Sequence, residues 1–203
     1  MALEFPRDLD ARLAHLTETR AALLREINWV APGFSPRALG ARGADVQCTL
    51  TTAAGRESGA AHEWSLAEIV YHLHLSEKSI AKLLRKRLAS ADRSESASDE
   101  QLRTEWERVA RLVGIRTPKV KAPALAEPLQ APALTEGIEL LGQSRKALLE
   151  VVQSGSYADL LRVSAPHPFE AIGTLTGASW LSVVAFHEHR HGEQIHHFGF
   201  SET

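Results

Sequence analysis

The stretch SLAEIVYHLHLSEKSIAKLLRKRLA, residues 65–89, predicts a long helix with a well-marked start. Ser65 and Glu68 have the spacing of a capping box, in which each side chain accepts a hydrogen bond from the other residue's backbone N–H. The residues that follow form an inward-facing stripe at helical spacing: Ile69, His72, Ser76 and Ile80. His74 lies about 160° around the helix from this stripe. We therefore expect a helix that carries one histidine toward the interior of the protein.

Helical spacing of apolar residues extends over most of the remaining chain. The other predicted helices cover about residues 7–27, 99–112, 135–152 and 177–197. Residues 28–61 are rich in Gly, Pro, Ser and Thr, and residues 117–134 carry four prolines, so both segments are predicted to be connections. Residues 45–52, DVQCTLTT, show only weak strand alternation. The sequence therefore predicts one all-α domain over residues 1–203, most simply a four-helix bundle with long connections and an extra short helix.

Composition and charge are those of an ordinary globular protein. Of the 203 residues, 44% are hydrophobic and 24% are charged, and the formal net charge at pH 7 is −2. This balance gives no reason to expect nucleic acid or an anionic membrane as a partner. The sequence shows no apolar run of membrane-span length and no signal-peptide pattern in residues 1–13, so we expect a cytoplasmic protein. Cys48 is the only cysteine, which excludes an intrachain disulfide.

Histidines are concentrated in FHEHRHGEQIHH, residues 186–197, which contains five of the ten histidines of the chain. On a helix, His187 and His191 lie on one face, about 6 Å apart along the axis. The same face carries apolar residues that indicate burial: Trp180, Val184 and Ile195. Buried imidazoles must be hydrogen-bonded, paired or bound to metal, and spacing alone leaves these alternatives open. The other three histidines of the stretch are expected to be exposed to solvent: His189, His196 and His197.

His187, Glu188 and His191 also match the H-E-x-x-H pattern of zinc proteases, in which two histidines bind zinc and the glutamate acts as general base. The surrounding sequence does not support this interpretation. Gln194 occupies the position where the metzincin extension requires a glycine, and Met1 is the only methionine, so there is no Met-turn. No predicted sheet is present to align a peptide substrate. A zinc protease is therefore disfavoured.

Three segments of the chain carry recurring motifs. HEWSLAEIVYHLHLSE, residues 62–77, fits the pattern W-S-x-x-E-x-x-x-H-L-x-x-x-E, and LLGQSRKALLEVV, residues 140–152, contains a Ser-Arg pair. APHPFEAIGTLTGASWLSVVAFHEHRHGEQI, residues 165–195, has an A-P-H-P turn and ends in H-x-x-x-H-x-x-Q-I. Together these segments resemble the DinB-like superfamily, with agreement from about residue 64 to residue 197. Residues 28–61 depart from the family, because they lack its short lead-in before the first motif.

The resemblance implies a four-helix bundle of up-down-down-up order with a long crossover. It also implies a divalent metal ion held by three histidines, one from the second helix and two from the last. Transferred residue by residue, these are His72, His187 and His191. Three neutral nitrogen ligands leave a coordination position for water or substrate, as in catalytic sites. Zinc and nickel both suit imidazole, so the ligands do not decide between them.

Four further residues are candidates for the pocket or for orienting the metal ligands. Glu68 and Glu188 are either hydrogen-bond partners of the imidazoles or helix-surface carboxylates. His167 is expected near the mouth of the pocket, unless it only shapes a turn with Pro168. Arg145 can bind an anionic substrate or pair with a carboxylate, and we favour the pair.

The resemblance implies a metal-dependent enzyme of the DinB-like, YfiT-like class that acts on a small molecule, as a thiol-dependent S-transferase or as a hydrolase. A three-histidine metal site lowers the pKa of a bound thiol or water and so creates a nucleophile. We expect a low-molecular-weight thiol as co-substrate, because Cys48 is far in sequence from the histidines. The alternative is a non-catalytic, stress-associated helical bundle whose metal ties helices together. A homodimer is compatible with either function.

Overall fold

The computed structural model describes residues 4–31, 64–90, 95–115 and 121–200, and it is predominantly helical. The α-helices in these ranges are α1 (Leu9–Val30), α2 (Leu66–Ala89), α3 (Asp99–Leu112), α4 (Leu134–Ser154), α5 (Tyr157–Arg162) and α6 (Gly177–Phe200). The shorter elements are the 3-10 helices η2 (Ala124–Ala126) and η3 (Glu170–Ile172) and the strands β1 (Ser164–Pro166) and β2 (Thr174–Thr176). The predicted all-α class is confirmed. Over the described ranges, each helix is too short or too polar to span a lipid bilayer.

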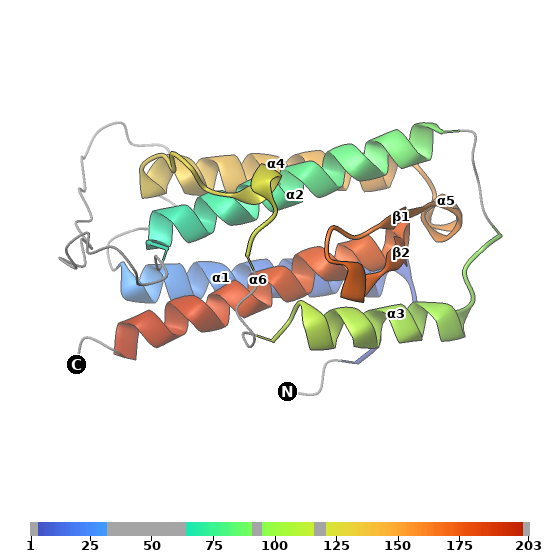
Figure 1. The fold of residues 1–203 in the computed structure, drawn as a ribbon, viewed down its shortest axis with the longest axis horizontal. Coiled ribbons are helices and arrows are strands. Elements are labelled where there is room, and N and C mark those ends of the chain that lie inside the picture. The colour runs from blue at the N-terminus through green and yellow to red at the C-terminus, as the bar shows by residue number, and fades with distance from the viewer. Residues whose placement is uncertain (1–3, 32–63, 91–94, 116–120, 201–203) are drawn as a thin grey trace.

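The long helices α1, α2, α4 and α6 run along the longest axis of the molecule (Figure 1). α1 packs against α6, α2 packs against α4, and α2 also contacts α6. Followed from blue to red, α1 and α6 run in one direction, whereas α2 and α4 run in the opposite direction (Figure 1). α3 packs against α6.

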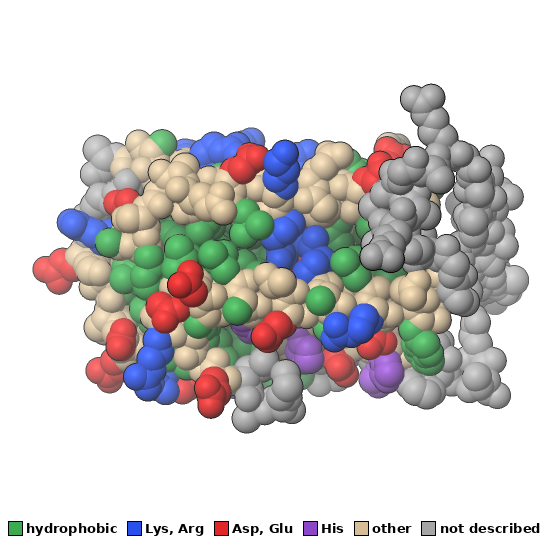
Figure 2. All heavy atoms as spheres, turned by 180° about the vertical axis from the view of Figure 1, so that it is seen from behind, with side chains coloured by type: hydrophobic (Ala, Val, Ile, Leu, Met, Phe, Trp, Pro, Cys, Tyr) green, Lys and Arg blue, Asp and Glu red, His purple; other side chains and the backbone are tan. Residues whose placement is uncertain are grey.

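The face that is turned away from the viewer in Figure 1 is shown in Figure 2. On this face, hydrophobic side chains form a band, and basic side chains interrupt the band near its middle (Figure 2).

The predicted capping box at the start of α2 is present. Ser65 Oγ accepts a hydrogen bond from the Glu68 N–H at 3.3 Å, and the Glu68 carboxylate accepts one from the Ser65 N–H at 2.7 Å. α1 and α3 also begin after a side chain that binds a free N–H of the first turn, Asp8 and Ser98 respectively. Each helix predicted from apolar spacing is present, and its first and last residues lie within a few positions of those predicted.

A short hairpin between α5 and α6 is a feature that the sequence did not predict. β1 and β2 pair antiparallel, with Ala165 opposite Leu175. Strands of three residues are too short to show the alternation of period two that identifies a strand. The hairpin fixes the place of His167, because that residue directly follows β1. The weak strand predicted over residues 45–52 lies outside the described residues, as does Cys48.

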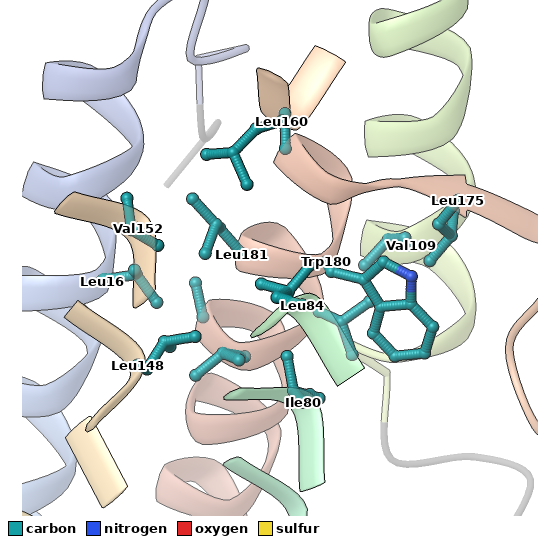
Figure 3. Packing of buried hydrophobic residues seen from close by; sticks show 14 of the residues in the cluster. Leu16, Ile80, Leu84, Val109, Leu148, Val152, Leu160, Leu175, Trp180 and Leu181 are labelled. Atoms are coloured by element: carbon teal, nitrogen blue, oxygen red, sulfur yellow. The ribbon is translucent and has the colours of Figure 1, made fainter. Parts of the chain in front are cut away.

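Hydrophobic side chains from the long helices fill the interior and hold α6 in place. Figure 3 shows Leu16 of α1, Leu148 of α4 and Leu181 of α6 in one buried cluster with residues of α2 and α3. The start of α6 is fixed by α3, because the buried Glu105 carboxylate accepts hydrogen bonds from the Thr176 N–H at 3.0 Å and the Thr176 hydroxyl at 2.9 Å. The helix that carries half of the chain's histidines is therefore anchored by apolar packing and by buried hydrogen bonds to Glu105.

Candidate metal centre

Three histidines from two helices meet in the interior. His72 lies on α2, and His187 and His191 lie one turn apart on α6. His187 Nε2 is 3.0 Å from His72 Nε2 and 3.1 Å from His191 Nε2. One ring nitrogen from each of the three residues lies within 4.8 Å of the others. The structure thus brings together the pair expected from helical spacing and the distant histidine that the resemblance added.

Hydrogen bonds at the outer nitrogens of two rings determine which nitrogen carries the proton. His72 Nδ1 lies 2.6 Å from the backbone oxygen of Ala126, in η2. His191 Nδ1 lies 2.8 Å from Gln194 Oε1, one turn further along α6. Both partner oxygens only accept hydrogen bonds, so in the neutral rings Nδ1 is the donor and Nε2 presents a lone pair. Such partners orient histidines in metal sites.

The three convergent nitrogens are better arranged to bind a cation than to form hydrogen bonds with one another. His72 Nε2 and His191 Nε2 are both acceptors that face His187 Nε2, which has at most one proton to donate. A cation between the rings would be attracted to all three lone pairs. Zinc–nitrogen bonds of about 2.0–2.1 Å place two ligands of a tetrahedral site about 3.3 Å apart, close to the separations seen here. The residues present therefore fit a divalent metal ion held by three imidazoles.

Burial keeps two of these rings in the neutral form that binds metal. The pKa of His187 is lowered well below its ordinary value, first by burial and then by the neighbouring His191 and His72. The pKa of His72 is also lowered, chiefly by burial; the hydrogen bond to Ala126 opposes this shift and Arg190 adds to it. Because only a neutral imidazole has a lone pair to offer, burial favours the state that a metal ligand needs.

A cavity of about 350 Å³ lies beside the histidines. Much of its wall consists of apolar side chains from α2, α3, α6, the crossover and the hairpin region, among them Leu83, Leu112, Leu125, Phe169, Ile172 and Val183. Ser76, Ser79 and Arg190 add polar groups. His167 also lines the cavity, with its ring stacked on Trp180 at a centroid distance of 5.2 Å. An apolar wall with a few polar groups is typical of sites for small molecules.

Comparison with known families shows the family of this chain. The sequence profile of the DinB superfamily matches residues 47–195, a range that includes His72, His187 and His191. The chain belongs to the DinB superfamily. It is also 29% identical over 138 residues to a DinB-like relative, the uncharacterized protein YuaE of Bacillus subtilis strain 168; the match covers 66% of this chain and 76% of YuaE. No solved structure shows significant similarity to the chain.

Membership in the DinB superfamily confirms the resemblance drawn from the sequence motifs. The structure also shows the roles of two residues that the sequence did not single out. Gln194, the glutamine of the H-x-x-x-H-x-x-Q-I motif, orients His191. The position of Gln194 three residues after a candidate ligand was the available signal, since i and i+3 share a helix face. The backbone oxygen of Ala126 gave no signal, because any residue can supply a carbonyl group.

The structure places two predicted pocket residues away from the cavity. Arg145 of α4 and Glu188 of α6 belong to a buried group with Arg20 of α1 and Glu77 of α2, here termed the Arg–Glu cluster. Arg145 Nη2 lies 2.9 Å from Glu188 Oε1, and Arg20 Nη2 lies 2.8 Å from Glu77 Oε2. Glu188 directly follows His187, so its side chain leaves α6 about 100° around the helix and faces α1 and α4 instead of the cavity.

Other polar residues considered from the sequence also have partners elsewhere. His74 is buried and its Nδ1 donates to a backbone oxygen of α4 at 2.8 Å. His189 is exposed as expected, whereas His196 Nδ1 lies 2.8 Å from the carboxylate of Glu26. Glu68 is hydrogen-bonded within the capping box. The three-histidine group, His167 and the apolar wall are therefore the features that define the candidate site.

Proposed function

We propose that this protein is a divalent-metal-dependent enzyme that acts on a small, largely apolar molecule, as a thiol-dependent S-transferase or a hydrolase. His72, His187 and His191 would hold zinc or nickel. The observation that carries the proposal is the convergence of three imidazole nitrogens beside an apolar cavity. When bound, such an ion supplies a Lewis acid that lowers the pKa of a thiol or water toward neutrality. Membership in the DinB superfamily supports the metal site.

The number of ligands favours catalysis over a purely structural role. Within the described ranges, no fourth histidine, cysteine, aspartate or glutamate joins the three-histidine group. His74 is hydrogen-bonded to α4, and His189 is exposed. Structural zinc sites are usually closed by four protein ligands, whereas three ligands leave a position for a reactant. A non-catalytic site that only ties α2 to α6 is therefore the less favoured alternative.

The chain's own residues would orient the ligands and enclose the substrate. The Ala126 carbonyl and the Gln194 side chain hold two imidazoles with Nε2 facing inward. The ring of Trp64 lies against His72 at a centroid distance of 4.6 Å, with 49° between the two planes. The apolar wall would bind the body of the substrate and exclude bulk water. Because the described residues that line the cavity include no cysteine, the thiol would come from a low-molecular-weight co-substrate.

We also propose that α1, α2, α4 and α6 form a four-helix bundle of up-down-down-up order within a single domain over residues 1–203. The shared direction of α1 and α6, opposite to that of α2 and α4, supports this topology (Figure 1). The long crossover before α4 supports it as well, because α2 and α4 run parallel and a short turn cannot connect parallel neighbours.

Turnover of generic probes tests the proposed activity. The chain would be stripped of metal, reloaded with zinc or nickel, and assayed for conjugation of a chlorodinitrobenzene with low-molecular-weight thiols and for hydrolysis of a nitrophenyl ester. We expect turnover that requires the metal and is lost in His72→Ala. It should persist in His189→Ala, since this side chain is exposed on the same helix as two ligands. Full metal binding with no turnover in either assay would favour the structural alternative.

A further inference from the structure

His167 is held more firmly than a residue that only shapes a turn. Its backbone N–H donates to the Gly173 oxygen at 2.9 Å, which ties the residue across the hairpin. The backbone N–H of Phe169 donates to His167 Nδ1 at 3.1 Å. One face of the ring lies on Trp180, with 19° between the two planes. Backbone, ring nitrogen and ring face are therefore all fixed, and the ring lines the cavity in one orientation.

The hydrogen bond from Phe169 decides the tautomer of His167. A backbone N–H can only donate, so Nδ1 must offer its lone pair. Burial lowers the pKa of His167 to about 4, so the ring is neutral near pH 7. In a neutral imidazole whose Nδ1 is an acceptor, the single proton resides on Nε2. His167 Nε2 is therefore an N–H donor, and the ring has no basic nitrogen left with which to act as a general base.

The ring of His167 lines the cavity, and its Nε2–H is available to a bound molecule. His167 Nε2 makes no hydrogen bond to the described residues. The nitrogen is nevertheless accessible and not buried without a partner. With Nδ1 bound to Phe169 and one ring face on Trp180, the accessible edge of the ring faces the space that it lines. His167 lines the same cavity as His72, His187 and His191. The donor and the candidate metal centre thus serve the same cavity.

We propose that His167 Nε2–H donates a hydrogen bond to an acceptor oxygen of the bound substrate and so positions that substrate at the metal centre. The inference rests on the proposed function and narrows its substrate class. The substrate would be a largely apolar molecule with a carbonyl-type oxygen next to its reacting atom. Most of the cavity wall cannot hydrogen-bond, so one fixed donor would orient such a molecule strongly. His167 would be a substrate-binding residue and not a metal ligand.

The tautomer can be measured without a substrate. Nitrogen-15 NMR of the zinc-loaded protein at pH 7 should show one imidazole, absent from the spectrum of His167→Phe, with a proton on Nε2 and an unprotonated Nδ1. A proton on Nδ1, or a charged ring at this pH, would overturn the inference. If His167→Phe does not fold, the spectrum of His167→Gln gives the same assignment, because it also lacks this imidazole.

The second measurement uses benzohydroxamate, a metal-binding probe with an apolar ring and a carbonyl oxygen, titrated into zinc-loaded protein. His167→Phe keeps an aromatic ring on Trp180 but removes the donor, and we expect about two- to tenfold weaker binding with unchanged zinc content. His167→Gln, which restores an N–H donor, should recover part of the affinity. Equal affinity of wild type and His167→Phe for benzohydroxamate would overturn the role of His167 but not the proposed function. Absence of zinc from the wild type would instead overturn the proposed function on which this role rests.

Discussion

Two polar clusters lie in the interior of this protein, and they use neighbouring residues of α6. The Arg–Glu cluster contains Glu188, whereas the three-histidine group contains His187. In the Arg–Glu cluster, each arginine is hydrogen-bonded to both glutamates. Burial alone would lower the pKa of Arg145, but Glu188 and Glu77 raise it above its ordinary value, so the guanidinium stays charged. Two cations and two anions are therefore matched within the chain itself, as buried charges require.

The three-histidine group lacks this internal balance. His72 and His191 present lone pairs to the same nitrogen of His187, which cannot donate to both. The group also borders a cavity, whereas the Arg–Glu cluster is packed between helices. The two clusters therefore differ in what they need. The Arg–Glu cluster is complete and joins four helices, whereas the three-histidine group could hold a cation that the chain does not itself supply.

Breaking the Arg–Glu cluster is expected to have the largest effect. Glu188→Gln leaves two guanidinium groups with one carboxylate, and we expect the free energy of unfolding to fall by about 3–5 kcal/mol. Urea denaturation of the metal-free protein would measure this change. Glu193→Gln is the matched control, because Glu193 is exposed on the same helix and its substitution should change stability by less than about 0.5 kcal/mol. Equal stability of the two variants would mean that the cluster does not fasten the helices.

Completing the three-histidine group should stabilise the fold. Zinc at about a hundredfold excess over its dissociation constant should raise the free energy of unfolding of the wild type by about 2.7 kcal/mol. The same zinc concentration should give no gain in His191→Ala, while Glu188→Gln should gain as much as the wild type. Thermal unfolding with and without zinc would provide the comparison. A similar gain in His191→Ala would show that zinc binds elsewhere.

Loosening one ligand without removing it should have a smaller effect. Gln194→Ala leaves His191 in place but removes the oxygen that accepts a hydrogen bond from its Nδ1–H. We expect zinc affinity to fall by about 10- to 100-fold, measured by competition with a chromophoric chelator. Glu193→Ala, one residue earlier and exposed, should keep the wild-type affinity. Unchanged affinity in Gln194→Ala would mean that this hydrogen bond does not orient the ligand.

The smallest expected effect is the pH dependence of the metal-free protein. Folding lowers the pKa values of His72 and His187, whereas in the unfolded chain both stay near about 6.5. Below about pH 6.5 the two histidines are protonated in the unfolded chain but stay neutral in the folded protein. The free energy of unfolding is therefore highest above this pH, and it decreases as the pH falls toward the lowered pKa values of the folded state. His187→Gln should flatten this dependence, and the exposed His189→Ala should not. Parallel pH profiles for the two variants would contradict the assignment.

Much of the helical framework could be predicted because its signals are local. The capping box of Ser65 and Glu68 and the period of apolar residues depend only on neighbours in the sequence. The pairing of His187 with His191 follows from the helical repeat in the same way. The addition of His72 needed the family resemblance, since no local pattern relates a residue of α2 to residues of α6.

The remaining features depend on contacts that single-sequence patterns do not encode. Three-residue strands carry too few positions to show a period, so the hairpin that holds His167 was not foreseen. The partner of His72 is a backbone oxygen of the proline-rich crossover, and a carbonyl group has no sequence mark. Arg145 and Glu188 were both candidates for the pocket, and a carboxylate pair was favoured for Arg145. The structure shows Arg145 paired with Glu77 and Glu188, but the sequence did not indicate which carboxylates these would be. Side-chain direction at helix interfaces is decided by tertiary packing.

The metal content of the purified, untagged protein, after zinc loading and removal of free metal, shows directly whether the three histidines hold an ion. We predict about one zinc ion per chain in the wild type and in His189→Ala, and almost none in His72→Ala, His187→Ala and His191→Ala. Loss in all three variants would establish that one ion joins α2 to α6. Retention of zinc in His72→Ala, or failure of the wild type to bind zinc or nickel at all, would contradict the claim that the three-histidine group is completed by a metal ion.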